Sequence, residues 1–260
     1  MFSEERRSEI LAKLNEEGRL LVKELAKKYN VSIDSIRRDL TIMEEQGLLK
    51  RTHGGAIPLP NVRTLAQPPS KRYGEGNAYQ NAIAKTAARY IKEGQTIFIG
   101  GAAIHYVLLK YLPNNISYTI LTNSIEIAYR TREWKHAKTY LIGGKVSSSG
   151  NMTDGFASNI ASHFTIDVSF ATAGGLSIKG LSTATPEVSI FNKTIYDNSN
   201  KIIAMIEHVK FGVDMFSRTY PLEKLNLIIT DKETSTALIN SVRTRGIEVI
   251  VAKQAPKSSV

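Results

Sequence analysis

Two adjacent arginines near the N-terminus lie in a pattern that is typical of proteins that read DNA. Arg37 and Arg38 fall in a predicted helix over residues 32–46. Apolar side chains recur in this helix at intervals of three and four residues and predict one buried stripe, made of Ile33, Ile36, Leu40 and Met43. The face left outside the stripe carries guanidinium and hydroxyl groups, on Ser32, Ser35, Arg37, Arg38 and Thr41. Because an arginine donates two hydrogen bonds to guanine O6 and N7, and hydroxyls reach phosphates or base edges, this face predicts contacts in a major groove.

A second group of cations follows in a segment that predicts a hairpin. Residues 48–57 favour two short strands, or one strand and a turn. Arg51 and His53 are predicted at the tip, Gly54 and Gly55 turn the chain, and Lys50 adds a second cation. Consecutive glycines at the turn let the backbone approach a phosphate or the minor groove, and the two cations add phosphate contacts. The segment therefore predicts a wing beside the DNA-reading helix.

Two more helices are predicted before the reading helix. The first has Ser3 as its N-cap and ends at Gly18, and the second covers residues 22–30. Ser32 is the predicted N-cap of the reading helix, and Gly47 is its predicted end. The alternative is a helical bundle with a solvated charged face. The order of helix, tight turn, arginine-bearing helix and basic hairpin favours instead a winged helix-turn-helix domain over residues 1–58.

A change of composition near residue 58 divides the chain. Residues 59–77 lack helical or strand periodicity, and residues 58–77 hold four of the eight prolines, which predicts an extended linker. Beyond the linker, β-branched runs alternate with helical stretches, so we expect a larger α/β domain over residues 78–253 with a mainly parallel sheet. The predicted strands cover residues 96–100, 118–123, 139–144, 167–175, 201–208, 226–231 and 247–252.

Small and polar residues follow several of these strands, where ligands bind in open α/β sheets. A loop of glycine and alanine separates the strand ending at Ile99 from a helix predicted to begin near Ile104. Free backbone N–H groups and the helix dipole converge at such a loop and attract anions. The residues at these strand ends are Gly100, Gly101, Ala102, Ala103, Thr122, Asn123, Gly174 and Gly175. Together they predict a ligand pocket, although each glycine alone is also typical of a plain turn.

No constellation of catalytic or metal-binding residues stands out. The absence of cysteine excludes a thiolate nucleophile and a zinc–thiolate site. The five histidines lack metal-ligand spacing, and no Ser-His-Asp order or pair of acids can be singled out. We interpret Asp231 as the cap of a helix starting near Thr234 rather than as a catalytic base. We therefore expect no catalytic residue, no metal and no cofactor.

The formal charge of +10 does not mark the DNA-binding part of the chain. The first 60 residues have a net charge of +1, and the other 200 have +9. The excess on the second domain either attracts an anionic ligand or is a solvated surface. The first residues carry charges of both signs, and the most apolar stretch, residues 96–112, contains His105 and Lys110. We therefore expect no membrane partner and a cytoplasmic protein.

The first domain resembles the DNA-binding head of the DeoR family of bacterial transcription regulators. The resemblance covers residues 3–58 and rests on the strings IRRDL, EEQG and RTHGGA in that order. It implies operator DNA as the partner and repression of a sugar-utilisation operon as the function. Because so small a head makes few base contacts, we expect repeated half-sites bound by a homodimer or homotetramer held through the second domains.

Residues 75–252 resemble the sensor domain of the same family, in the strings LTNS, IGGK, DVSFATAGGLSIKGL, HVKFG and LIITD. The family sensor is similar to sugar-phosphate isomerases of the ribose-5-phosphate isomerase type and usually binds a phosphorylated sugar. The resemblance assigns Thr122 and Asn123 to the Thr-Asn-Ser loop of the family. It assigns Lys210 to the lysine of the Asp-x-x-Lys-Phe motif and so adds this residue to the effector site.

The chain departs from the family pattern at several of these positions. The family loop Asp-Ser-Gly-Thr-Thr is replaced by residues 100–104, without its carboxylate and hydroxyls. Glu207 replaces the Asp of the later motif, and Phe191 stands where the family has a lysine. Because a site without these polar partners binds the usual ligand poorly, we expect an altered effector specificity. The alternatives are an isomerase-like enzyme with an accessory helical domain, which needs a carboxylate base that this loop lacks, and a domain that only oligomerises.

Overall fold

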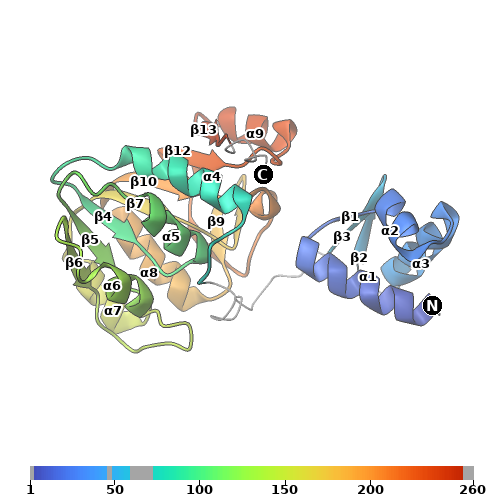
Figure 1. Ribbon diagram of the computed structural model, residues 1–260, viewed down its shortest axis with the longest axis horizontal. Coiled ribbons are helices and arrows are strands. Elements are labelled where there is room, and N and C mark those ends of the chain that lie inside the picture. Colours follow the sequence, from blue (N-terminus) through green and yellow to red (C-terminus); the bar gives the residue numbers. More distant parts are fainter. Residues whose placement is uncertain (1–2, 46–48, 59–72, 254–260) are drawn as a thin grey trace, which may run out of the picture. The chain divides into compact units, whose positions relative to one another are not determined.

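The structure, a computed structural model, describes residues 3–45, 49–58 and 73–253. The chain divides into two units, residues 1–61 and 62–260. Figure 1 shows the helices and strands of both. The predicted end of the reading helix at Gly47, most of the predicted linker and residues 254–260 lie outside the described residues.

The described part of the first unit combines three helices with a small antiparallel sheet. The sheet has the strand order β1-β3-β2. The elements are α1 (Ser3–Glu17), β1 (Leu20–Leu21), α2 (Val22–Tyr29), α3 (Ile33–Glu45), β2 (Leu49–Thr52) and β3 (Gly55–Pro58). The predicted helices and the hairpin are confirmed, except that Ser3 is the first residue of α1 and not the cap before it. The short strand β1 was not predicted.

Apolar residues from all three helices and from the sheet form the core of this unit. Ile10 and Leu14 of α1 meet Leu25 of α2 and Leu40 of α3, and all four are almost completely buried. Gly18 ends α1 in the left-handed conformation, with φ of 74°, so the chain turns sharply toward β1. The core therefore fixes the orientation of α3 within this unit.

A seven-stranded parallel sheet forms the centre of the second unit, in the order β13-β12-β10-β7-β4-β5-β6. It consists of β4 (Thr96–Ile99), β5 (Tyr118–Thr122), β6 (Ala137–Leu141), β7 (Ile166–Ala171), β10 (Ser199–Met205), β12 (Leu227–Thr230) and β13 (Glu248–Val251). The expectation of a mainly parallel sheet is confirmed, and each predicted strand corresponds to one of the seven.

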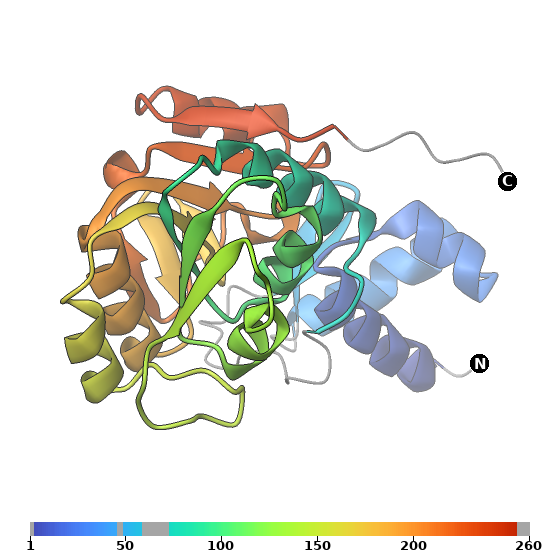
Figure 2. The ribbon, with the colours of Figure 1, turned by 60° about the vertical axis from the view of Figure 1, so that its left-hand side comes forward.

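Helices cover both faces of this sheet, as Figures 1 and 2 show. One apolar cluster joins the sheet to α4 (Ala78–Ala87), α5 (Ala103–Leu108) and α6 (Ile125–Thr131). A second cluster joins the other face to α7 (Gly155–Ala161), α8 (Pro186–Asp197) and α9 (Thr236–Arg243). Burial on both faces explains why the central strands are continuously apolar rather than alternating.

A second, antiparallel sheet in this unit was not predicted. Its strand order is β11-β9-β8, with β8 (Gly175–Ser177), β9 (Gly180–Thr183) and β11 (Ser217–Tyr220). Short helices of the 3-10 type connect several elements, namely η2 (Ala88–Tyr90), η3 (Leu109–Tyr111), η4 (His208–Lys210) and η5 (Leu222–Lys224). The seven parallel strands were visible as continuous apolar runs, whereas β8, β9 and β11 are short and rich in glycine, serine and threonine and show no such run.

Candidate nucleic-acid interface and effector site

Helix α3, which the sequence predicts to read DNA, begins at the predicted cap. Asn30 ends α2 in the left-handed conformation, with φ of 50°, and its backbone N–H bonds back into that helix. Ser32 Oγ accepts the backbone N–H of Ser35 at 3.1 Å and also lies 2.9 Å from Ser35 Oγ. The cap satisfies one of the free donors at the start of α3 and confirms the predicted role of Ser32 in starting the helix.

Two guanidinium groups lie on the solvent side of α3. Arg37 and Arg38 are both exposed, and Arg37 Nη1 lies 3.2 Å from Oδ1 of the exposed Asp34. Thr41, one turn further along, is half-buried and donates its hydroxyl to the Arg37 carbonyl at 2.9 Å. Because an exposed ion pair is worth only about 0.2–1 kcal/mol, Arg37 exchanges Asp34 for another acceptor at little cost.

The buried stripe of α3 differs from the predicted one at its first position. Ile36, Leu40 and Met43 are buried as predicted, but Ile33 is 39% exposed. Ile33 is the first residue of α3 and projects beyond the core that the other three fill. The buried face contains instead a carboxylate, Asp39, which is 3% exposed.

Asp39 joins α3 to α1 through a buried ion pair. Its Oδ2 lies 2.7 Å from Nε of Arg6, which is 8% exposed, and its Oδ1 lies 3.5 Å from Nη1 of Arg7. The sequence analysis missed this cluster. The available signal was the position of Asp39, three residues after Ile36 and one before Leu40, which places a carboxylate on the buried face.

The wing is tied to the reading helix by Arg51 of β2. Its backbone N–H donates to Glu44 Oε1 at 2.8 Å, and its Nη1 donates to Thr41 Oγ1 at 2.5 Å. The neighbouring cation Lys50 and the turn residues His53 and Gly54 are exposed. These bonds hold the exposed part of the hairpin beside the exposed face of α3.

Three neighbouring strand ends of the parallel sheet form the candidate effector site. The order β7-β4-β5 brings together Thr172, the loop 100–103 and the pair Thr122 and Asn123, because each lies at the carboxyl end of one of these strands. Thr122 is buried, and its Oγ1 accepts the backbone N–H of Ser124 at 3.1 Å. Asn123 is 3% exposed, and its Nδ2 donates to a backbone carbonyl at 2.8 Å. Asn123 Oδ1 and Thr172 Oγ1 are buried without a hydrogen-bond partner among the described residues.

Side chains of the protein itself occupy the loop after β4. Asn151 covers Gly101 so closely that a β-carbon on Gly101 would lie 1.8 Å from Asn151 Oδ1. Asn151 Nδ2 points at the Gly101 carbonyl at 3.4 Å. His105 Nδ1 accepts the backbone N–H of Ala102 at 3.3 Å, and His105 Nε2 donates to the Phe170 carbonyl at 2.7 Å. The expectation of free N–H donors is therefore wrong for Ala102, and α5, with six residues, begins one residue before the predicted start.

His105 is a neutral side chain in this site. The pKa of His105 is lowered to about 4, mainly by burial and in smaller part by the charge of Lys210, against hydrogen bonds at Phe170 and Gly100 that favour the protonated form. The two hydrogen bonds of His105 fit a neutral imidazole, in which one ring nitrogen accepts and the other donates, because Nδ1 accepts and Nε2 donates. The loop 100–103 therefore gains no positive charge from His105 near pH 7.

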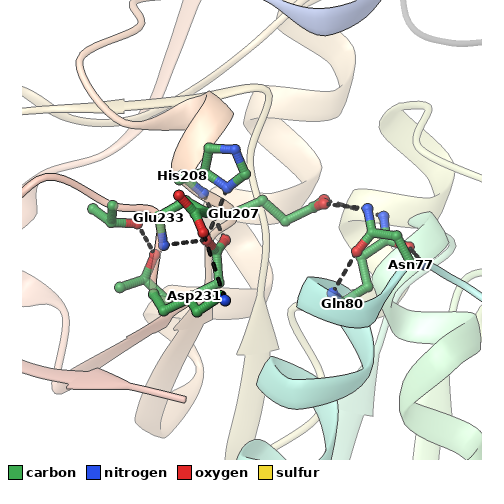
Figure 3. A network of polar contacts seen from close by, with 9 residues as sticks. Asn77, Gln80, Glu207, His208, Asp231 and Glu233 are labelled. Carbon is green, nitrogen blue, oxygen red and sulfur yellow. Dashed lines mark hydrogen bonds and ion pairs between the residues drawn. The ribbon is translucent and has the colours of Figure 1, made fainter. Parts of the chain in front are cut away.

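Lys210 and Glu207 contribute a pair of opposite charges beside His105. Lys210 Nζ lies 3.9 Å from Glu207 Oε1, and burial lowers the pKa of Lys210 while the Glu207 charge opposes that shift. Glu207 accepts Nδ2 of Asn77 at 3.3 Å and Nε2 of Gln80 at 3.1 Å, as Figure 3 shows. The carboxylate therefore joins the start of α4 to η4, although these residues are far apart in the sequence.

Asp231 has a different role from the predicted one. Its carboxylate accepts the backbone N–H of His208 at 2.9 Å, His208 Nδ1 at 2.8 Å and the backbone N–H of Glu233 at 3.0 Å (Figure 3). Helix α9 is capped instead by Ser235, whose Oγ accepts the Leu238 N–H. The interpretation of Asp231 as the cap of this helix is therefore wrong, because the chain makes a further turn before α9 begins.

Gly174 and Gly175, which lie at the start of β8 and not at the end of β7, pack against a neighbouring loop. A β-carbon on Gly175 would lie 2.3 Å from the Val213 carbonyl oxygen, and one on Gly174 would lie 2.9 Å from the Met215 side chain. The nearest contacts of both glycines are thus with residues 213–215. Close packing of two backbones explains the glycine at position 175 without a ligand.

The family comparison covers both units. Residues 6–59 match the family described as the DeoR-like helix-turn-helix domain, and residues 77–232 match the DeoR C terminal sensor domain. The second match alone spans more than half of the chain. The chain belongs to the DeoR family. The expected membership and the expected order of a winged helix-turn-helix domain and an α/β domain are confirmed.

Named relatives of this DeoR-family protein are transcription regulators, not enzymes. The HTH-type transcriptional repressor GlcR of Bacillus subtilis (strain 168) is 29% identical over 98% of this chain and 98% of its own length. The lactose phosphotransferase system repressor of Staphylococcus aureus (strain NCTC 8325 / PS 47) is 26% identical over 90% of this chain and 94% of its own length. The protein is therefore a DeoR-family transcription regulator, and the names of these relatives do not support the isomerase-like alternative.

Among solved structures, ribose 5-phosphate isomerase A of Methanocaldococcus jannaschii has a TM-score of 0.38 and 14% identity, over 51% of this chain and 53% of its own.

None of the described helices is long and apolar enough to cross a bilayer.

The departure at Phe191 is explained by packing in this DeoR-family sensor. Phe191 is fully buried in the cluster under α8, with its ring centroid 6.2 Å from that of Phe98. Lys193, two residues later, is exposed and pairs with Asp197. The position at which the family has a lysine is thus part of the core, and neither residue supplies a charge to the strand-end site.

Proposed function

We propose that this protein represses a carbohydrate-utilisation operon by binding operator DNA through the first unit. The observation that carries the proposal is the exposed face of α3, on which Arg37 and Arg38 stand beside a wing held in place by the Arg51–Thr41 bond. The names of the relatives support the sign of regulation and the class of operon, since one of them is a lactose phosphotransferase system repressor.

In this proposal the two arginines read base edges and the wing contacts the DNA backbone. Arg37 leaves Asp34 to reach a guanine, while Arg38 already faces solvent. Lys50, His53 and the exposed backbone at Gly54 supply phosphate or minor-groove contacts. Ser32, Ser35 and Thr41 add hydroxyls at the start and middle of the helix.

A single reading helix recognises only a short half-site. We propose that two or four copies of the chain bind repeated half-sites and that the sensor domains hold the copies together. Such an assembly gives the protein enough base contacts for a specific operator, because binding free energies of the heads combine.

We propose that a small carbohydrate-derived metabolite is the effector and binds at the strand ends of β7, β4 and β5. Buried Asn123 Oδ1 and Thr172 Oγ1 support the site, because unpartnered buried polar atoms are costly unless a ligand or water satisfies them. The neutral His105 and the paired Lys210 and Glu207 make this a weak site for a phosphate dianion. We therefore expect ordinary hexose and pentose phosphates to bind weakly.

The DNA-binding part of the proposal is tested with an operator selected from a random-sequence pool. In gel-shift titrations we expect Arg37→Ala and Arg38→Ala each to weaken operator binding by about 5- to 150-fold, which corresponds to about 1–3 kcal/mol for a bidentate guanine contact. Lys13→Ala is the control, because Lys13 lies on α1 and pairs with Glu17. Unchanged affinity in both arginine variants would refute the assignment of α3 as the reading helix.

The effector part is tested by calorimetry with common hexose and pentose phosphates. Weak or absent heat is the expected result. Tight binding of an ordinary sugar phosphate would contradict the expected change in specificity, but would leave the DNA-binding assignment intact.

A further inference from the structure

The segment Tyr73–Asn77, called here the junction segment, contains the first described residues that follow the DNA-binding unit along the chain. It is exposed or half-buried. Its contacts nevertheless reach three separate parts of the sensor, namely the turn 147–151, α5 with the η3 that follows it, and Glu207 before η4. This arrangement is not required by the fold of the sheet, because the junction segment precedes α4 and belongs to no strand.

The first connection runs to the turn that covers Gly101. Tyr73 donates its hydroxyl to the Ser149 carbonyl at 3.1 Å. Ser149 lies in a tight turn in which the Ser147 N–H bonds to the Asn151 carbonyl at 3.0 Å and the Gly150 N–H bonds to the Ser147 carbonyl at 2.9 Å. The side chain that covers Gly101 and the carbonyl that holds Tyr73 therefore belong to one hydrogen-bonded turn.

The second connection runs to α5, which begins directly after the loop 100–102. The ring centroids of Tyr73 and Tyr106 lie 5.3 Å apart. Lys110, which follows α5 in η3, donates to the Glu75 carbonyl at 2.5 Å and pairs with Glu75 Oε2 at 3.0 Å. A β-carbon on Gly76 would lie 2.4 Å from the Val107 side chain, so the junction segment also packs tightly on this helix.

The third connection runs to Lys210 through Glu207. Asn77 ends the junction segment and caps α4, with Gln80 completing the capping box. Both amides donate to the Glu207 carboxylate, whose Oε1 lies 3.9 Å from Lys210 Nζ (Figure 3). A ligand acceptor that draws Lys210 toward the loop therefore weakens the attraction that helps to hold Glu207.

The space above Gly101 is already filled, and this makes the first connection sensitive to a ligand. Any group that enters this space displaces the Asn151 side chain, because its Oδ1 would be within 1.8 Å of even a single added carbon. Asn151 belongs to the same hydrogen-bonded turn as Ser149, so displacement of Asn151 is a change within the turn that accepts the Tyr73 hydroxyl. The two states of the site then differ in their contacts to the junction segment, which is the physical requirement for coupling.

We propose that the junction segment carries the occupancy of the strand-end site to the DNA-binding unit, with the Tyr73–Ser149 hydrogen bond as its principal contact. The proposal rests on the proposed function, because it needs both an effector site and an operator-binding head. In the empty state Asn151 covers Gly101 and Tyr73 holds the turn. In the occupied state the turn moves, Tyr73 is released, and the junction segment loses its fixed position.

The experiment uses the full chain without any ligand, and the variant Asn151→Ala replaces the ligand as the perturbation. Hydrogen exchange of backbone amides is measured for Asn151→Ala, Tyr73→Phe, the double variant and the natural protein. We expect Asn151→Ala to accelerate exchange in residues 147–151 and also in residues 73–77. Tyr73→Phe alone should accelerate exchange in residues 73–77 by about fivefold, the worth of one neutral hydrogen bond, and Asn151→Ala should add little to it.

Tyr118→Phe is the matched control, because Tyr118 also donates its hydroxyl to a backbone carbonyl, that of Pro113 at 2.9 Å, away from this site. It should leave exchange in residues 73–77 unchanged. The proposal is overturned if Asn151→Ala accelerates exchange only in the turn, or if the two substitutions act additively on residues 73–77.

A second measurement separates this inference from the proposed function. Operator affinity of the same variants is determined with DNA selected from a random-sequence pool. The proposal is supported if Asn151→Ala and Tyr73→Phe both change the operator affinity in the same direction. It is overturned if the operator affinity is unchanged in both variants although their hydrogen exchange is coupled. If the natural protein selects no DNA at all, the proposed function fails, while the exchange result still decides whether the turn and the junction segment are coupled.

Discussion

The buried carboxylate of Asp39 leads to the sharpest prediction about the first unit. Replacement by alanine removes the partner that lies 2.7 Å from Nε of Arg6 and 3.5 Å from Nη1 of Arg7. Arg6 is 8% exposed, so its charge remains in the protein interior without compensation. Breaking a buried pair in this way costs about 3–5 kcal/mol, mainly because the remaining charge is desolvated.

A loss of that size is comparable to the whole stability of a small domain. Stabilities of about 5–15 kcal/mol are typical of complete domains, and a unit of about 60 residues lies at the lower end. We therefore expect Asp39→Ala to unfold the first unit in a large fraction of molecules and to abolish operator binding. The parallel sheet of the second unit should remain folded, because the two units have separate cores.

Hydrogen exchange of the full chain in increasing urea measures the free energy of unfolding separately for α1, α3 and the strands of the large sheet. Asp34→Ala is the matched control on the same helix, since its carboxylate is exposed and pairs with the exposed Arg37 at 3.2 Å. It should change the free energy by less than about 1 kcal/mol. A change below about 1 kcal/mol in Asp39→Ala as well would refute the view that this pair holds α1 to α3.

Three further predictions concern the two sites. Between pH 6.5 and pH 4, His105 is protonated in the unfolded chain but stays neutral in the folded chain. The free energy of unfolding should therefore fall by up to about 3 kcal/mol as the pH is lowered through this range. Urea titrations at several pH values should show a flatter profile for His105→Gln, and an identical profile would contradict the neutral state of His105. Gly175→Ala should destabilise the sensor by about 1–3 kcal/mol in urea titrations, because its methyl group meets a backbone carbonyl at 2.3 Å; Gly174→Ala, which meets only a flexible side chain, should cost less, and equal costs would argue against this explanation. Thr41→Ala removes the acceptor of Arg51 and should weaken operator binding more in gel shifts than it changes thermal stability; a change in stability alone would show that the bond only supports the fold.

The main elements of the fold follow from patterns among near neighbours in the sequence. The third helix was predicted from its Ser32 cap and the spacing of Ile36, Leu40 and Met43, since both features depend on residues within one or two turns. The seven parallel strands were predicted from continuous β-branched runs, because strands that are buried on both faces need no polar positions. Residues that such patterns cannot place include Ile33, which has the right spacing but lies at the end of the helix beyond the core.

The candidate effector site could be located from the sequence, but its chemistry could not. Glycine and alanine after β4 correctly marked a strand end, whereas the side chains that occupy the loop come from positions 105 and 151. His105 lies on the helix that the loop opens, but Asn151 approaches from a turn about 50 residues away. No local pattern indicates which distant side chain fills such a space.

The amino-acid sequence by itself therefore determined the two-part architecture, the third helix with the hairpin that follows it, and the family to which the chain belongs. These features depend on periodicity, caps and turn residues, whose effects act over a few residues. Only the tertiary structure decided that Asp39 holds Arg6, that Glu207 joins Asn77 to the neighbourhood of Lys210, and that Tyr73 holds the turn over Gly101. The hydrogen bonds of Arg6 to Asp39, Tyr73 to Ser149 and Asn77 to Glu207 join residues that are 33, 76 and 130 positions apart. Only packing of the whole domain brings such residues together.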